Sequence, residues 1–74
     1  GLLRRPIAVA ARGDVLLFRM RDSGIAKHLG IQAETDPKAG FIHAYTGHGV
    51  IESPLSQPWQ RRIVARFRFP LGAD

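Results

Sequence analysis

The chain has 74 residues, of which 45% are hydrophobic and 23% are charged, and this balance excludes a disordered polypeptide. It contains no cysteine, so disulfides cannot compensate for the small core that so short a domain can bury. Eleven Lys and Arg against six Asp and Glu give a net charge of +5, which favours polyanionic partners without choosing among them.

The predicted elements are short strands separated by turns that contain Gly or Pro. The stretch 2–11 is ambiguous. Alternating or continuous apolar residues then predict strands at 15–20, 26–32, 41–45, 50–53 and 63–69. Turns or loops are predicted at 12–14, 21–24, 33–40 and 46–49, with a loop or one helical turn at 54–62. No helix is long enough for a parallel crossover, so we expect an antiparallel meander, curled or barrel-like if it closes.

The last predicted strand alternates most cleanly, which assigns its side chains to two faces. Its buried face is predicted to consist of Ile63, Ala65, Phe67 and Phe69. Arg66 and Arg68 fall on the other face, where we interpret them as a solvated edge that discourages aggregation. Asp14, which follows Gly13 at a strand start, is interpreted as a turn-capping residue. Trp59 is interpreted as part of the core.

Histidines are the main candidates for chemistry. His28 and His43 lie within neighbouring predicted strands, so pairing of these strands would bring their side chains together on one face. Cβ atoms of such neighbours are about 4.5–5.5 Å apart, or about 7–8 Å diagonally. One imidazole can then orient another as a general base, although a half-buried sheet residue with a satisfied hydrogen bond is the alternative. Gly30 permits close approach, and His48, in a turn, is expected to be exposed and idle.

The stretch from Gly13 to Phe69 resembles the C-terminal half of the NlpC/P60 family of cell-wall cysteine peptidases. The motifs that carry this resemblance occur in order at residues 13–18 (GDVLLF), 27–31 (KHLGI), 41–44 (FIHA) and 49–52 (GVIE), followed by the turn with Trp59 and the strand with Arg66-Phe67. The compact form, with Tyr45 after the His-Ala pair and Pro70 after the last strand, is most similar to the phage-tail and gene-transfer-agent branch.

The resemblance implies a papain-like α+β fold, of which residues 1–74 would be a single partial domain, mainly an antiparallel β-meander of about five strands. It implies that His28 is the general base and His43 the orienting residue, without a metal or cofactor, in hydrolysis of a peptidoglycan stem peptide through a thioester. The family's cysteine precedes the Gly13-Asp14 strand, and no cysteine is present here. We therefore expect this chain alone to be inactive, and its start at Gly1 favours a fragment of a longer enzyme over a non-catalytic relative.

The expected partners are the peptidoglycan peptide, phage-tail-like proteins, and either the missing N-terminal half of the domain or a second copy of the chain on an uncovered inner sheet face. By resemblance the location is the cell envelope or a phage-like tail particle. No membrane contact is expected, because no apolar run approaches the roughly 20 residues that span a bilayer.

Two alternatives to a peptidase stay open. A small basic β-barrel module for nucleic acid or another polyanion would account for the net charge, but it lacks an exposed aromatic pair for stacking on bases. A zinc site would need His28, His43 and His48 together, whereas His48 belongs to a separate predicted turn.

Overall fold

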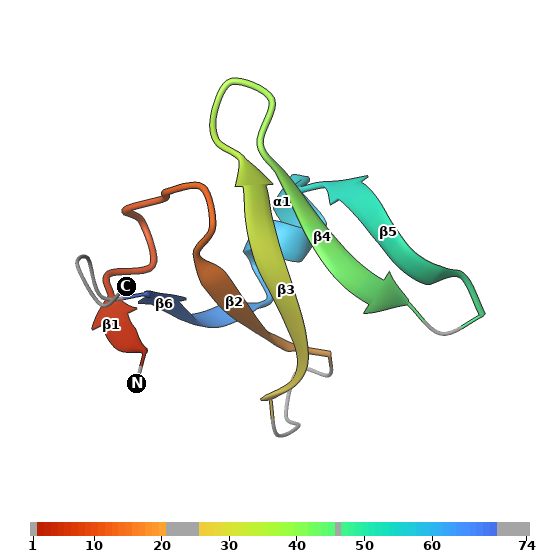
Figure 1. The fold of residues 1–74 in the computed structure, drawn as a ribbon, viewed down its shortest axis with the longest axis horizontal. Helices are drawn as coiled ribbons and strands as arrows, with labels where there is room; N and C mark the ends of the chain where they lie inside the picture. Colours follow the sequence, from red (N-terminus) through yellow and green to blue (C-terminus); the bar gives the residue numbers. More distant parts are fainter. Residues whose placement is uncertain (1, 21–25, 46, 70–74) are drawn as a thin grey trace.

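In the computed structural model, the described residues are 2–20, 26–45 and 47–69, and they form one antiparallel sheet with a single short helix (Figure 1). The elements are β1 (Leu3–Arg5), β2 (Val15–Arg19), β3 (Ala26–Glu34), β4 (Gly40–Tyr45), β5 (Gly49–Pro54), α1 (Gln57–Gln60) and β6 (Ile63–Arg68). The order across the sheet is β1-β6-β2-β3-β4-β5. Strands β2 to β5 thus form the predicted meander, and β6 returns to pair with the other side of β2.

The five predicted strands are confirmed as β2 to β6, with ends that shift by at most two residues. The sixth strand, β1, forms within the ambiguous stretch 2–11 and pairs with β6. The helical turn predicted within 54–62 is α1, which has Pro58 in its first turn. The turn predicted at 21–24, Thr46 of the turn at 46–49, and Pro70 lie outside the described residues.

The α+β papain-like class is wrong for this chain. The described residues form an all-β sheet, and their one helix has four residues. A helix of that length rises about 6 Å, too little to form a layer over a sheet. The segments between the Gly and Pro residues are short, and apolar and polar side chains alternate within them with a period of two. Both features favour strands over helices. Strands β1 and β5 are the two edges of this order, so the sheet is open.

The inner face of the sheet carries the core. Leu16, Phe18 and Phe41 have no exposed surface, and Trp59 and Ile63 pack against them. Helix α1, which carries Trp59, lies behind β3 and β4 in Figure 1 and packs Trp59 against Phe41 on this face. A four-residue helix covers only part of this face, so self-association through the rest of it stays a prediction. The assignment of Trp59 to the core is confirmed.

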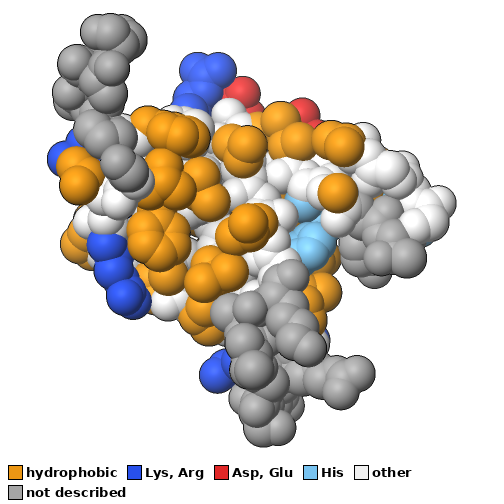
Figure 2. Space-filling view, turned by 60° about the horizontal axis from the view of Figure 1, so that its bottom comes forward, with side chains coloured by type: hydrophobic (Ala, Val, Ile, Leu, Met, Phe, Trp, Pro, Cys, Tyr) orange, Lys and Arg blue, Asp and Glu red, His pale blue; other side chains and the backbone are white. Residues whose placement is uncertain are grey.

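Four exposed apolar side chains lie on the outer face. Leu29, Ile31, Ile42 and Val50 alternate with the inward residues of β3, β4 and β5, and each is at least 38% exposed. Hydrophobic side chains dominate the surface in the view of Figure 2, with histidine side chains at their margin. Self-association stays a prediction, and this outer face is its candidate surface.

Arg66 is buried, which corrects its interpretation as a solvated edge residue. It is 2% exposed and lies opposite Leu16 in the pairing of β2 with β6, so it shares the inner face with that leucine. A register shift between Leu17 and Phe18 in this pairing breaks the simple alternation. Phe69, assigned to the buried face from sequence, is 61% exposed.

A buried polar network surrounds the carboxylate of Asp14. Arg66 Nη1 donates to Asp14 Oδ2 at 3.2 Å and to Gln32 Oε1 at 2.8 Å. Arg5 Nε lies 3.0 Å from the same Oδ2 as an ion pair, but off the axis of a hydrogen bond. The backbone N–H of Ala11 also donates to Oδ2, so Asp14 does cap its turn and in addition anchors two arginines.

Candidate active site

The pairing of β3 with β4 places two histidines diagonally on the inner face. Gly30 is the Cα partner of His43, and His28 precedes Gly30 by two residues on the same face of β3. A Cβ atom at Gly30 would lie 2.9 Å from Cδ2 of Phe41, so a larger residue would collide with that ring. The expected close approach at Gly30 is confirmed, and the predicted meeting of His28 and His43 occurs by the diagonal geometry.

Two hydrogen bonds link three side chains into a relay. His28 Nε2 lies 2.8 Å from His43 Nδ1, and His43 Nε2 lies 2.9 Å from Ser53 Oγ. The imidazole planes of the two histidines are nearly perpendicular, at 89°. Among the described residues, the bond to His43 is the one hydrogen bond of the His28 ring. Its Nδ1 is therefore the atom that can exchange a proton with a reacting group.

Aromatic rings hold both imidazoles in place. The Phe41 ring stacks on His43 with centroids 4.2 Å apart and planes inclined by 27°. The Trp59 ring packs against both histidines, with ring centroids 5.8 Å apart for His28 and 5.2 Å apart for His43. The ring centroid of Phe18 lies 5.9 Å from that of His28. Such packing restricts rotation of the imidazole rings. A general base needs this restriction because its proton-accepting atom must keep one direction.

Burial disfavours the charged form of His43. This side chain is 4% exposed, and its burial, together with the neighbouring charge of His28, lowers its pKa below the ordinary value of 6.5. A neutral imidazole has one N–H donor and one bare nitrogen acceptor, whereas an imidazolium has two donors. His43 can therefore accept a hydrogen bond at one nitrogen while it donates at the other, as an orienting residue requires.

The lowered pKa of His43 predicts a pH dependence of stability. Below pH 6.5 the unfolded chain binds more protons at this residue than the folded chain does, so the free energy of unfolding falls as pH drops toward the folded pKa. Above pH 6.5 this contribution is fully present. We expect the free energy of unfolding, measured with urea between pH 5 and pH 8, to depend less steeply on pH for His43→Gln than for the wild type. His48→Gln should keep the wild-type slope, and equal slopes for all three proteins would contradict the prediction.

His48 lies in the turn between β4 and β5 and is exposed, as predicted. The zinc alternative needs three converging ligands, and the described ranges contain no group of three or more His, Cys, Asp or Glu that could hold a metal ion. The three histidines therefore do not converge.

Ser53 is the member of the relay that the sequence interpretation missed. It lies on β5, opposite Phe41 of β4, and follows the inward-facing Ile51 by two residues. Alternation within the predicted strand 50–53 puts a polar side chain at an inward position there. A polar side chain at an inward strand position is the sequence feature that could have identified Ser53.

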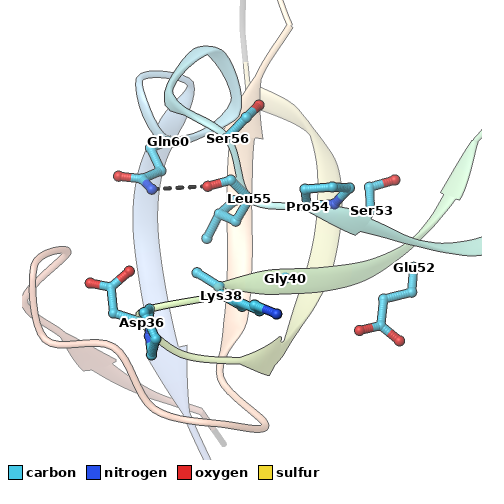
Figure 3. A pocket seen from close by; sticks show the side chains of 11 residues that line it. Asp36, Lys38, Gly40, Glu52, Ser53, Pro54, Leu55, Ser56 and Gln60 are labelled. Carbon is cyan, nitrogen blue, oxygen red and sulfur yellow. Dashed lines mark hydrogen bonds between the residues drawn. The ribbon is translucent and has the colours of Figure 1, made fainter.

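An open cleft of about 740 Å³ borders the relay at Ser53 (Figure 3). It lies between the connection that precedes β4 and the segment that links β5 to α1, where Gln60 Nε2 donates to the Leu55 carbonyl. Its charged lining residues are Asp36, Lys38 and Glu52. The cleft thus presents charges of both signs to a ligand beside Ser53, the end of the relay farthest from His28.

Comparisons with protein-family models, with curated proteins and with solved structures gave no match. Across the described residues, no helix has the length and apolar character needed to cross a membrane.

Proposed function

We propose that His28 is the general base, and His43 the residue that orients it, in a thiol-dependent amide hydrolase acting on the peptidoglycan stem peptide. The supporting observation is the 2.8 Å hydrogen bond from His28 Nε2 to His43 Nδ1. It engages Nε2 of His28 and leaves Nδ1 as the nitrogen that can take up a proton. Base and orienter in this arrangement are two of the three parts of a nucleophile–base–orienter site.

The third part, the nucleophile, is a thiol from a segment outside these 74 residues, which contain no cysteine. His28 Nδ1 takes the thiol proton, and the thiolate sulfur attacks the amide carbonyl carbon. As the C–N bond breaks, the imidazolium returns its proton to the leaving amine, and a thioester remains. Water then attacks the thioester carbonyl while His28 accepts a water proton, which releases the acid and regenerates the thiol.

The substrate class rests on the ordered motifs that resemble NlpC/P60 peptidases. The cleft beside Ser53 supports it, because Asp36, Lys38 and Glu52 supply charges of both signs, and stem peptides carry both carboxylates and amines. A hydrophobic pocket alone would not hold such a ligand.

The test is hydrolysis of purified peptidoglycan by the protein isolated from its natural source. Release of new amino groups and of cleaved muropeptides, detected by mass spectrometry, is expected, and alkylation of thiols with iodoacetamide should abolish it. The present chain alone serves as the matched control and should release none. Hydrolysis that survives alkylation, or no hydrolysis by the natural protein, would overturn the proposal.

Polyanion binding is the second candidate, and one observation favours it. Among the described residues, a surface depression is lined by Pro58 and by Arg19, Arg61 and Arg62, and none of these four side chains is acidic. However, Arg62 Nη1 donates to the Met20 carbonyl at 2.7 Å, which leaves less of its guanidinium for a phosphate. The peptidase proposal accounts for more of the geometry, because polyanion binding gives the histidine relay no role.

A further inference from the structure

Ser53 ends the relay with a group that can either donate or accept a hydrogen bond. Its hydroxyl lies 2.9 Å from His43 Nε2 and belongs to β5, an edge strand, so the relay crosses three neighbouring strands. A serine hydroxyl has one proton and two lone pairs. Two directions of donation along the relay are therefore chemically possible, and they have opposite consequences for His28.

In one direction, Ser53 accepts a proton donated by His43 Nε2–H. His43 Nδ1 is then bare and accepts from His28 Nε2–H, so His28 Nδ1 keeps its lone pair and can act as a base. In the other direction, Ser53 donates to His43 Nε2, His43 Nδ1–H donates to His28 Nε2, and His28 carries its proton on Nδ1. The second arrangement cannot accept a proton at Nδ1, so general-base chemistry requires the first.

Packing alone cannot produce this arrangement. Phe41, stacked 4.2 Å from His43, fixes the plane of the imidazole. It does not distinguish the ring from its 180° flip, because both flips have nearly the same shape and differ only in which atoms are nitrogen. In the flipped ring, carbon atoms would replace the nitrogens that meet His28 and Ser53. The two hydrogen bonds must therefore select the flip, and Ser53 provides one of them.

We infer that Ser53 is a positioning residue whose hydroxyl accepts the His43 Nε2 proton and so holds His28 with its Nδ1 unprotonated and available. The direction of donation rests on the proposed function, whereas the two hydrogen bonds themselves do not. Without the hydroxyl, Nε2 of a side chain that is 4% exposed loses its hydrogen bond to Ser53. The His43 ring then populates both flips, and the bond to His28 is lost in one of them.

The test uses the ¹⁵N-labelled chain and compares Ser53→Ala, Ser53→Val and Ser53→Thr with the wild type. Thr and Val have the same shape and differ only in the hydroxyl, and β5 is an edge strand that accepts β-branched residues. Long-range ¹H–¹⁵N spectra report which imidazole nitrogens carry protons. The scalar coupling between His28 Nε2 and His43 Nδ1 reports the hydrogen bond directly. Backbone amide spectra verify that each variant is folded.

We expect unprotonated His28 Nδ1 and a measurable coupling in the wild type and in Ser53→Thr. The coupling should disappear, or fall at least twofold, in Ser53→Ala and Ser53→Val. An unchanged coupling in folded Ser53→Ala and Ser53→Val overturns the inference, and so does its loss in all three variants. An intact relay in a protein that does not cleave peptidoglycan would instead refute the proposed function alone.

Discussion

His28→Gln lowers kcat/KM for thiol-dependent stem-peptide hydrolysis by the natural protein about 100- to 10,000-fold, the usual contribution of a general base. Glutamine retains a hydrogen-bonding side chain but cannot accept a proton at neutral pH. The residual rate should increase with pH, because only thiolate formed without the base can react. Initial rates on purified muropeptides between pH 5 and pH 9 measure both effects.

His48→Gln is the matched control for this substitution. It makes the same chemical change at an exposed histidine of the turn between β4 and β5. We expect its kcat/KM to stay within twofold of the wild type. Equal losses in the two variants would show that His28 does not act as the base, even if hydrolysis itself is confirmed.

Arg66→Met lowers the free energy of unfolding by about 3 kcal/mol, the lower end of the cost of breaking a buried ion pair. Both side chains of the pair are 3% exposed, so solvent cannot replace the lost partner of Asp14. Arg5, which remains 3.0 Å from the Asp14 carboxylate, limits the loss. Urea denaturation followed by Trp59 fluorescence measures the difference.

Two further variants show whether the loss of stability arises from the Asp14 carboxylate that Arg66→Met leaves without its partner. Arg4→Met makes the same change at an exposed position of β1 and should cost less than about 0.5 kcal/mol. In Arg66→Met/Asp14→Asn the buried carboxylate is neutralised, and only Arg5, whose side chain is 23% exposed, loses an ion-pair partner, so part of the stability should return. A loss for Arg66→Met no larger than for Arg4→Met would contradict the assigned role of the network.

Local pattern was sufficient to predict most of the sheet and the meeting of the two histidines. His28 and His43 each occupy an inward position of a period-two strand, and the strands are joined by a short connection, so antiparallel pairing left few registers. Because Gly30, opposite His43, has no side chain, the ring of Phe41 can pack against its backbone. These features depend on neighbouring strands, which sequence periodicity describes well.

The mistaken predictions concern contacts between distant segments. Regular alternation from Ile63 predicts an outward Arg66, whereas the irregular pairing of β2 with β6 turns it inward beside Leu16. A buried arginine becomes favourable only when Asp14 and Gln32 are present to receive it, which one strand cannot reveal. The α+β class was inferred from the resemblance, and the all-β sheet with its four-residue helix corrects it.

The two polar clusters differ in how much chain must be closed to form them. The His28–His43 bond joins residues 15 positions apart, and His43 and Ser53 are separated by 10. The Arg66–Asp14 bond closes 52 positions. Loop-closure entropy makes this longer closure more costly by about 1 kcal/mol than the 15-residue one. The histidine relay therefore depends on contacts that are local in the sequence, whereas the arginine network joins β6 to segments near the start of the chain.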